Sequence, residues 1–255
     1  MFIKKQGFVD EMTGEKFYKV TYPSDTLKVK ALMYEPDEVK RIVMYLRGGK
    51  GNVGQIRTAR LLQFSYEDTL VIAPYYRGYE GNGRDEFGGK DQADVVYLIR
   101  LLNDMYPNIP IHLIGFSRGG LQGLLTFEQA PVTSFIFWAG VSSIYYMYEE
   151  RADLRGLLHK MVGDPVKDQA EYDKREAINH VSPLAPPIMI IHGTADQNVG
   201  MQHALLLHER LETLRVHHEM HLIEGEAHVF QPDALKQILH EIQRFIIQSE
   251  GRENK

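Results

Sequence analysis

Residues 115–119, Gly115-Phe116-Ser117-Arg118-Gly119, match the pattern Gly-x-Ser-x-Gly, in which the serine acts as a nucleophile. The motif follows an apolar run at 111–115 that predicts a strand, and it precedes a helical pattern at 121–127. A sharp turn from strand to helix needs small neighbours, because bulky side chains would prevent it from closing. The N-terminus of the helix also favours negative charge that develops beside it. We therefore interpret Ser117 as a catalytic nucleophile.

A serine hydroxyl is a weak nucleophile at neutral pH and needs an adjacent general base. In the fold typical of this motif, an acid and then a histidine follow the serine along the chain. Asp196 comes just after a strand predicted at 188–191, and His228 comes after a strand predicted at 219–223. We predict that His228 is the base and that Asp196 accepts its Nδ1 proton. His192 is expected to structure the turn that leads to Asp196.

Acyl transfer builds negative charge on the carbonyl oxygen, and backbone N–H groups stabilise that charge. The first predicted donor is the N–H of Arg118, the residue after the nucleophile. The second is expected from a glycine-rich loop after an early strand, here Leu46-Arg47-Gly48-Gly49. The choice lies between Gly48 and Gly49, and we favour Gly49.

The same loop permits a different interpretation, because residues 49–54 (GKGNVG) match the dinucleotide-binding pattern G-x-G-x-x-G. That pattern requires an acid at the end of the following strand, but the strand predicted at 70–73 runs into Pro74-Tyr75-Tyr76-Arg77. Arg77 keeps the alternative open, as a contact for the 2′-phosphate of NADPH. Saturable NADPH binding at micromolar concentration would overturn the hydrolase interpretation.

A zinc site is not expected. His218-Glu219-Met220-His221 falls one residue short of H-E-x-x-H, and it lies on a predicted strand rather than a helix. The sequence therefore predicts neither a metal nor a cofactor.

The predicted elements alternate between short apolar strands and helices, which favours a mostly parallel sheet covered on both faces. A hairpin at 16–35 supplies antiparallel strands at one edge. We predict an α/β-hydrolase fold with a mostly parallel eight-stranded sheet, helices on both faces and a short helical lid insertion at about 143–183. Residues 1–255 are expected to form a single domain. The predicted strands are 42–46, 70–73, 111–115, 134–138, 188–191 and 219–223, and the predicted helices are 55–66, 91–105, 121–127, 204–214 and 233–248.

Composition excludes several other classes of protein. The 255 residues carry a formal net charge of −5, which provides no basic face for a nucleic acid. Cysteine is absent, so disulfides and thiolate chemistry are excluded. The N-terminus lacks the apolar run of a signal peptide, and no apolar run is long enough to span a membrane. We expect a cytoplasmic protein with no nucleic acid or membrane partner, and a homo-oligomer is compatible with the sequence.

Taken together, the motifs resemble the catalytic domain of the prolyl oligopeptidase family over roughly residues 17–248. The resemblance implies hydrolysis of peptide or ester acyl groups through Ser117, Asp196 and His228. Arg47 is a departure, because related enzymes often carry histidine there. Only about forty residues precede the oxyanion loop, so we expect a small single-domain member without a β-propeller. The residues that carry the resemblance are Arg47-Gly48-Gly49, Tyr76-Arg77-Gly78, Gly81-Asn82-Gly83-Arg84, Gly88-Gly89-Lys90-Asp91, residues 115–120, Gly163-Asp164-Pro165, residues 192–196 and residues 225–228.

Three functions are weighed. The favoured one is hydrolysis of a small-molecule ester or other acyl group through an acyl-enzyme intermediate. The alternative is an aminopeptidase or oligopeptidase acting on short peptides. A non-catalytic binding member of the fold is disfavoured, because no member of the triad is missing. Candidates for an apolar acyl pocket are Trp138, Tyr145, Tyr146 and Tyr148, and candidates for contact with a substrate amine are Glu149 and Glu150.

Overall fold

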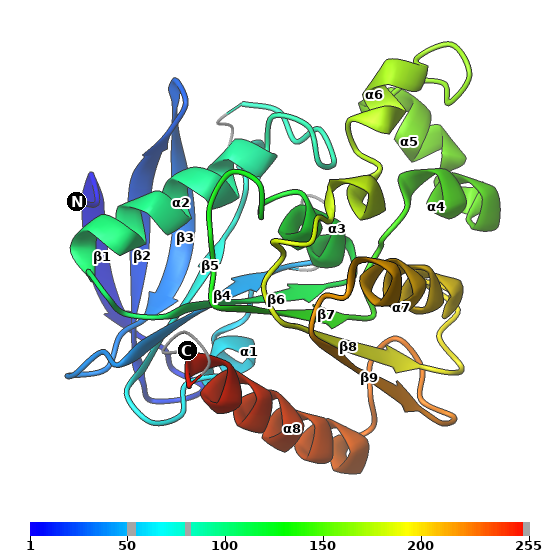
Figure 1. The fold of residues 1–255 in the computed structure, drawn as a ribbon. Helices are drawn as coiled ribbons and strands as arrows, with labels where there is room; N and C mark the ends of the chain where they lie inside the picture. Colours follow the sequence, from blue (N-terminus) through cyan, green and yellow to red (C-terminus); the bar gives the residue numbers. More distant parts are fainter. Residues whose placement is uncertain (50–54, 80–82, 252–255) are drawn as a thin grey trace.

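A computed structural model describes residues 1–49, 55–79 and 83–251, and in these ranges nine strands form one sheet (Figure 1). Their order in the sheet is β1-β2-β3-β5-β4-β6-β7-β8-β9. From β5 to β9 the neighbours run parallel, whereas β1, β2 and β3 pair antiparallel, including β3 with β5. The predicted α/β-hydrolase fold and mostly parallel sheet are confirmed, with nine strands rather than eight. The strands are β1 (Lys4–Val9), β2 (Lys16–Ser24), β3 (Leu27–Tyr34), β4 (Arg41–Leu46), β5 (Thr69–Pro74), β6 (Ile111–Phe116), β7 (Ser134–Trp138), β8 (Ile188–Gly193) and β9 (His218–Ile223).

The additional strand is β1, which forms the antiparallel edge of the sheet. It pairs with β2 along its whole length, from Lys4 opposite Thr21 to Val9 opposite Lys16. Its side chains are almost all exposed, so its sequence lacks the alternation of apolar and polar residues that marks a half-buried strand. Pairing with β2 rather than burial forms this strand, and the apolar pattern therefore did not reveal it.

Helices cover both faces of the sheet, as predicted. In Figure 1, α2, α3 and α7 lie on one face, and α1 and α8 lie on the other. Each face has its own apolar cluster, the first including Leu98 and Leu207 and the second including Leu61 and Phe245. No helix in the described ranges is both long enough and apolar enough to cross a bilayer. The helices are α1 (Thr58–Leu62), α2 (Gln92–Met105), α3 (Arg118–Leu124), α7 (Gln202–Leu214) and α8 (Pro232–Glu250).

Two helices differ from their predicted bounds. The helix predicted at 55–66 is only the short α1, Thr58–Leu62. The helix predicted at 121–127 begins earlier, at Arg118, directly after Ser117. Its first turn contains Gly119 and Gly120, and glycine is a poor helix former, which hid the true start of the helix.

The interval 143–183 lies between β7 and β8 and is made of short helices. Its buried residues Ile144, Leu158 and Tyr172 belong to the first apolar cluster, so the insertion packs onto the face that carries α2, α3 and α7. The elements of the insertion are α4 (Ile144–Glu150), η2 (Ala152–Leu154), α5 (Arg155–Met161), α6 (Gln169–Asp173) and η3 (Ala177–His180).

Candidate active site

Ser117 lies at the turn between β6 and α3 in a backbone conformation that residues with a side chain rarely adopt. Its φ is 57° and its ψ is −123°, a strain of about 1–3 kcal/mol. Hydrogen bonds from neighbouring segments hold the turn in place. The Ser117 N–H donates to the Trp138 carbonyl at 3.0 Å, and the Ser117 carbonyl accepts from Gly120 at 2.9 Å and Val141 at 3.1 Å. This is the sharp strand-to-helix turn that the motif predicts.

Glycines allow β4 and α3 to approach this turn closely. A Cβ atom at Gly115 would lie 2.4 Å from the Gly119 carbonyl oxygen. A Cβ atom at Gly119 would lie 1.9 Å from the Leu46 carbonyl oxygen. Both contacts are with backbone, so rotating a side chain cannot relieve them.

We expect Gly119→Ala to lower the free energy of unfolding by at least about 4 kcal/mol, because α3 would have to move away from β4. Urea unfolding followed by circular dichroism measures this change. Gly156→Ala in α5 is the matched control, since no atom lies within 4 Å of its added Cβ. An alanine in a helix should stabilise that variant by about 0.5–1 kcal/mol. Equal stability of the two variants would contradict the prediction.

Asp196 and His228 come together from the turns that follow β8 and β9. The distance from His228 Nδ1 to Asp196 Oδ2 is 2.7 Å, and the Asp196 side chain is fully buried. Asp196 Oδ1 accepts the backbone N–H groups of Asn198 at 2.8 Å and Val199 at 3.0 Å. Burial raises the pKa of Asp196, but hydrogen bonds from His228 and Val199 outweigh it and hold the pKa below its ordinary value. Asp196 is therefore ionised at neutral pH and suited to accept Nδ1–H, which leaves His228 Nε2 as a base.

Ser117 and His228 line the same cleft, whose volume is about 870 Å³. Phe116 precedes Ser117 in the chain. The centroid of its ring lies 4.8 Å from the centroid of the His228 ring. Within the described residues, the side-chain hydrogen bond of His228 is to Asp196 and none joins it to Ser117. Such contacts are often long without substrate and shorten when it binds. The structure thus places two of the three predicted residues, Ser117 and His228, at one cleft, and the third, Asp196, is buried against His228.

His192 holds the turn that carries Asp196. Its side chain is fully buried, and its Nε2 lies 2.9 Å from the Val199 carbonyl oxygen. Burial lowers the pKa of His192, which favours the neutral imidazole. A neutral ring that donates Nε2–H to Val199 fixes the same segment whose N–H groups bind Asp196.

The predicted oxyanion loop lies directly against Ser117. A Cβ at Gly48 would lie 2.8 Å from Ser117 Cβ, so only glycine fits there, and Gly49 has a φ of +66°. The side chain of Arg47 donates to the Gly48 carbonyl at 3.1 Å and to the Tyr75 carbonyl at 3.1 Å. The C=O and N–H of a trans peptide point in opposite directions. Arg47 therefore directs the Gly49 N–H away from its own guanidinium.

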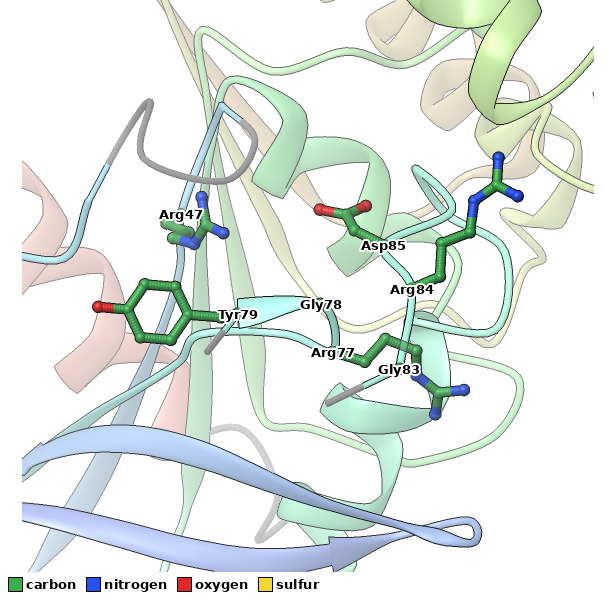
Figure 2. Close-up of a pocket in the computed structure, with 7 residues that line it drawn as sticks. All are labelled: Arg47, Arg77, Gly78, Tyr79, Gly83, Arg84 and Asp85. Atoms are coloured by element: carbon green, nitrogen blue, oxygen red, sulfur yellow. The ribbon is translucent and has the colours of Figure 1, made fainter. Parts of the chain in front are cut away.

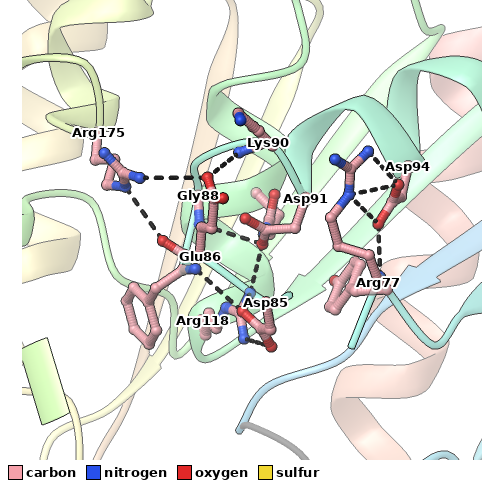
Figure 3. Close-up of polar contacts among 12 residues, drawn as sticks. Arg77, Asp85, Glu86, Gly88, Lys90, Asp91, Asp94, Arg118 and Arg175 are labelled. Atoms are coloured by element: carbon pink, nitrogen blue, oxygen red, sulfur yellow. Dashed lines mark hydrogen bonds and ion pairs between the residues drawn. The ribbon is translucent and has the colours of Figure 1, made fainter. Parts of the chain in front are cut away.

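The side chain of Arg118 is buried and forms ion pairs that the sequence did not predict (Figure 3). Its guanidinium donates to both oxygens of Asp85 at 2.7 Å and to Asp91 at 2.5 Å. Burial raises the pKa of Asp85, but Arg118 outweighs it, so the pKa lies below its ordinary value. The Arg118 guanidinium also lies over the ring of Phe87, at 4.8 Å. The only sequence signal was that Asp91 stands in a segment that carries the family resemblance without a catalytic role of its own.

A second cleft, of about 230 Å³, lies beside Arg47 (Figure 2). Its charged residues pair with charged residues outside the lining or with backbone groups. Arg77 pairs with Asp94 at 2.8 Å, and Arg84 donates to the Lys160 carbonyl at 2.7 Å. Arg84 thereby connects the loop before α2 to the insertion. The lining residues are Arg47, Arg77, Gly78, Tyr79, Gly83, Arg84 and Asp85.

The aromatic and acidic candidates of the insertion are absent from the lining of the cleft. Tyr145 donates to Asp173, and Tyr148 hydrogen-bonds His159, each at 2.7 Å. Glu150 accepts the Gly200 N–H at 3.1 Å. A helical pattern alone does not say which face of α4 turns toward the cleft. The described residues of the insertion that line the cleft are Met147, Arg151, Leu154 and Leu157, and not Tyr145, Tyr146 or Tyr148.

The dinucleotide alternative loses the arginine contact that kept it open. Residues 50–54 of its motif lie outside the described residues, so the motif itself is untested. Arg77, its expected phosphate contact, is 5% exposed and binds Asp94 through both its side chain and its backbone N–H. An arginine held in this way is not available to a 2′-phosphate.

The two histidines of the near-zinc motif face different neighbours. His221 Nε2 lies 3.4 Å from Glu219 on its own strand. His218 Nε2 instead faces α7, at 2.8 Å from His208 Nδ1 and 3.3 Å from Glu212. His218 therefore contacts residues of α7, which lies outside the motif.

Known proteins resemble this chain both in sequence and in structure. The curated protein "Uncharacterized peptidase YtmA" of Bacillus subtilis (strain 168) is 36% identical over 255 residues, which cover 96% of this chain and 99% of that protein. A puromycin-hydrolyzing peptidase of Mycobacterium tuberculosis superposes with a TM-score of 0.76 at 20% identity, over 96% of this chain and 40% of its own. An esterase of Thermogutta terrifontis superposes with a TM-score of 0.71 at 21% identity, over 94% and 96%.

The two structural likenesses have low sequence identity and support the α/β-hydrolase fold alone. The relationship in sequence is more specific. The model of the prolyl oligopeptidase family matches residues 62–252, which is more than half of the chain. Together with the near full-length relative from B. subtilis, this match shows that the chain is a serine hydrolase and belongs to the prolyl oligopeptidase family.

Proposed function

We propose that the chain hydrolyses carboxylic esters or acyl groups, with Ser117 as nucleophile, His228 as general base and Asp196 as the acid that orients it. The observation that carries the proposal is the 2.7 Å contact between His228 and Asp196, formed at a cleft that also contains the strained Ser117. Family membership supports serine hydrolysis, and the contact supports this choice of residues.

The reaction proceeds through an acyl-enzyme. Ser117 Oγ attacks the substrate carbonyl carbon, while His228 Nε2 takes the hydroxyl proton and the carbonyl oxygen becomes an oxyanion. When the intermediate collapses, the bond to the leaving group breaks and His228 gives its proton to the departing alcohol or amine. Water then attacks the Ser117 ester, with His228 taking and returning a proton in the same way. The products are the acid and free Ser117.

The proposed oxyanion hole consists of the N–H groups of Arg118 and Gly49. Arg118 is the first residue of α3, where backbone N–H groups have no partner within the helix. Gly48 contributes by lacking a Cβ, which leaves the substrate oxygen room beside Ser117. In this proposal Arg47 takes the place of the usual histidine and orients the Gly49 N–H through the Gly48 carbonyl. We also propose that the insertion at 143–183 acts as a lid within a single domain, because its residues line the cleft.

Fluorophosphonate labelling tests the proposal. We expect the folded protein to react with a fluorophosphonate probe, to carry the adduct on the peptide that contains Ser117 and to hydrolyse p-nitrophenyl butyrate. Mass spectrometry identifies the labelled peptide. Folded protein that neither reacts nor turns over any ester would favour a non-catalytic member of the fold.

Peptidase activity is the second candidate, and it is favoured by the name of the B. subtilis relative, which is called a peptidase. An ester and an amide of the same acyl group separate the two functions, for example the p-nitrophenyl ester and the p-nitroanilide of N-acetyl-alanine. We expect a higher kcat/KM for the ester. A higher value for the anilide would assign the chain as a peptidase acting through the same three residues.

A further inference from the structure

The charged residues of the Ser117 cleft are all of one sign. The described lining includes four arginines but no aspartate or glutamate. The chain as a whole has 34 acidic residues against 29 lysines and arginines, and a net charge of −5. The cleft therefore differs in charge from the rest of the molecule. Its four arginines are Arg57, Arg60, Arg118 and Arg151.

Two of these arginines are neutralised by the protein itself. Arg118 is paired with Asp85 and Asp91, as described above. Arg151 donates through two nitrogens to Asp153, at 2.8 and 2.7 Å. The positive charge of these side chains is balanced locally, so they add little net charge to the cleft.

Arg57 and Arg60 have no carboxylate partner among the residues that the structure describes. Arg60 donates to the neutral Gln63 side chain at 2.9 Å, and its guanidinium lies over the rings of Phe116 at 5.8 Å and Trp138 at 5.7 Å. Arg57 is the exposed residue just before α1. Because the ring of Phe116 also contacts that of His228, Arg60 is held close to the proposed catalytic base by neutral groups.

Another part of the lining is apolar. It consists mainly of residues from the insertion and from the loops after β7 and β8, which come from other parts of the chain than the two arginines. The cleft that contains Ser117 therefore has both an apolar wall and a cationic wall. The apolar wall is formed by Val141, Met147, Leu154, Leu157 and Val199.

We infer that the substrate of this cleft is an acyl compound that carries a second, negatively charged group, a carboxylate being the simplest, which Arg57 and Arg60 bind. This inference rests on the proposed function. Two guanidinium groups without a counter-charge in a partly enclosed cleft attract anions and form charge-assisted hydrogen bonds with them. The apolar part of the substrate packs against the insertion. Hydrolysis itself follows the steps given above, with the anionic group unchanged.

Two pairs of esters test the inference, because the members of each pair differ by one added carboxylate. The neutral substrate is p-nitrophenyl butyrate. p-Nitrophenyl hemiglutarate places a carboxylate on the acyl side, and the butyrate ester of 4-hydroxybenzoate places one on the leaving-group side, with phenyl butyrate as its neutral partner. kcat/KM is measured for each ester with the wild-type chain, Arg57→Gln, Arg60→Gln and the double variant. Arg100→Gln, an exposed arginine of α2, is the control.

We expect the wild-type chain to prefer the anionic member of at least one pair by about tenfold or more in kcat/KM, the size of hydrogen bonds to a charged group. The ratio should fall to near unity in the double variant and stay unchanged in Arg100→Gln. It should also fall as NaCl is raised from about 50 mM to about 500 mM, because salt screens the arginines. The pair that shows the preference tells whether the charge belongs to the acyl or the leaving group.

Two results would overturn the inference. One is a wild-type ratio near unity for both pairs while the neutral esters are hydrolysed. The other is a preference that survives in the double variant. Both leave the proposed function intact. Absence of ester turnover together with absence of fluorophosphonate labelling would instead remove the proposed function, and the inference with it.

Discussion

Replacing Ser117 with alanine is expected to lower kcat for p-nitrophenyl butyrate by about 10⁶-fold, the loss typical when the nucleophile of a serine triad is removed. The fluorophosphonate adduct should disappear at the same time. Alanine removes only the hydroxyl oxygen, and the hydrogen bonds that hold the turn come from the backbone of Ser117. Thermal unfolding should therefore show a folded protein.

The losses of kcat caused by substituting the three proposed triad residues should not be additive. His228→Ala is expected to cost about as much as Ser117→Ala, and the double variant no more than either one, because nucleophile and base act as a unit. Asp196→Asn should lower kcat by about 10⁴-fold, since an amide favours the wrong tautomer of His228. Ser65→Ala, at a half-buried serine after α1, is the control for an unrelated hydroxyl. Loss of activity that added up across the double variant would contradict a shared catalytic unit.

The sequence predicted those parts of the protein that are encoded locally. The central strands are continuous apolar runs, and the nucleophile turn is a five-residue motif with glycines on both sides. Asp196 and His228 were predicted as partners because each lies in the turn after a strand, and parallel strands end at the same edge of a sheet. Their contact spans 32 positions of the chain, yet it follows from where the strands end.

The parts that could not be predicted depend on contacts between side chains from distant loops. Nothing in the sequence around Asp85 or Asp91 predicts that both contact the side chain of Arg118. Similarly, Arg47 was visible only as a departure from histidine, and its role in holding the Gly48 carbonyl required the structure. The edge strand β1 was not predicted for a different reason. Its side chains are almost all exposed, so its sequence does not alternate between apolar and polar residues.

Arg118 should prove to be one of the most sensitive positions for stability. Arg118→Met is expected to lower the free energy of unfolding by about 3–5 kcal/mol, because it leaves buried carboxylates without their partner. Methionine fills much of the same volume, so the loss reports on charge rather than on a cavity. Urea unfolding at pH 8 measures it, and Arg100→Met on the outer surface of α2 should change stability by less than about 0.5 kcal/mol.

The effect of Arg118→Met should depend on pH in a definite direction. In the wild-type chain the pKa of Asp85 is held below its ordinary value, so its contribution to stability is present at neutral pH and is lost only as the pH falls through that lowered pKa. Without Arg118, burial is opposed only by the Phe87 N–H and by Arg47, so the pKa of Asp85 rises above its value in the wild-type chain. At mildly acidic pH, protonation of Asp85 then removes the cost of a buried, unpaired charge in the variant, whereas the wild-type Asp85 is still ionised. The gap in unfolding free energy between the two proteins should therefore narrow from pH 8 to about pH 5. A gap that widened over this range would show that Arg118 does not hold Asp85 as an ion.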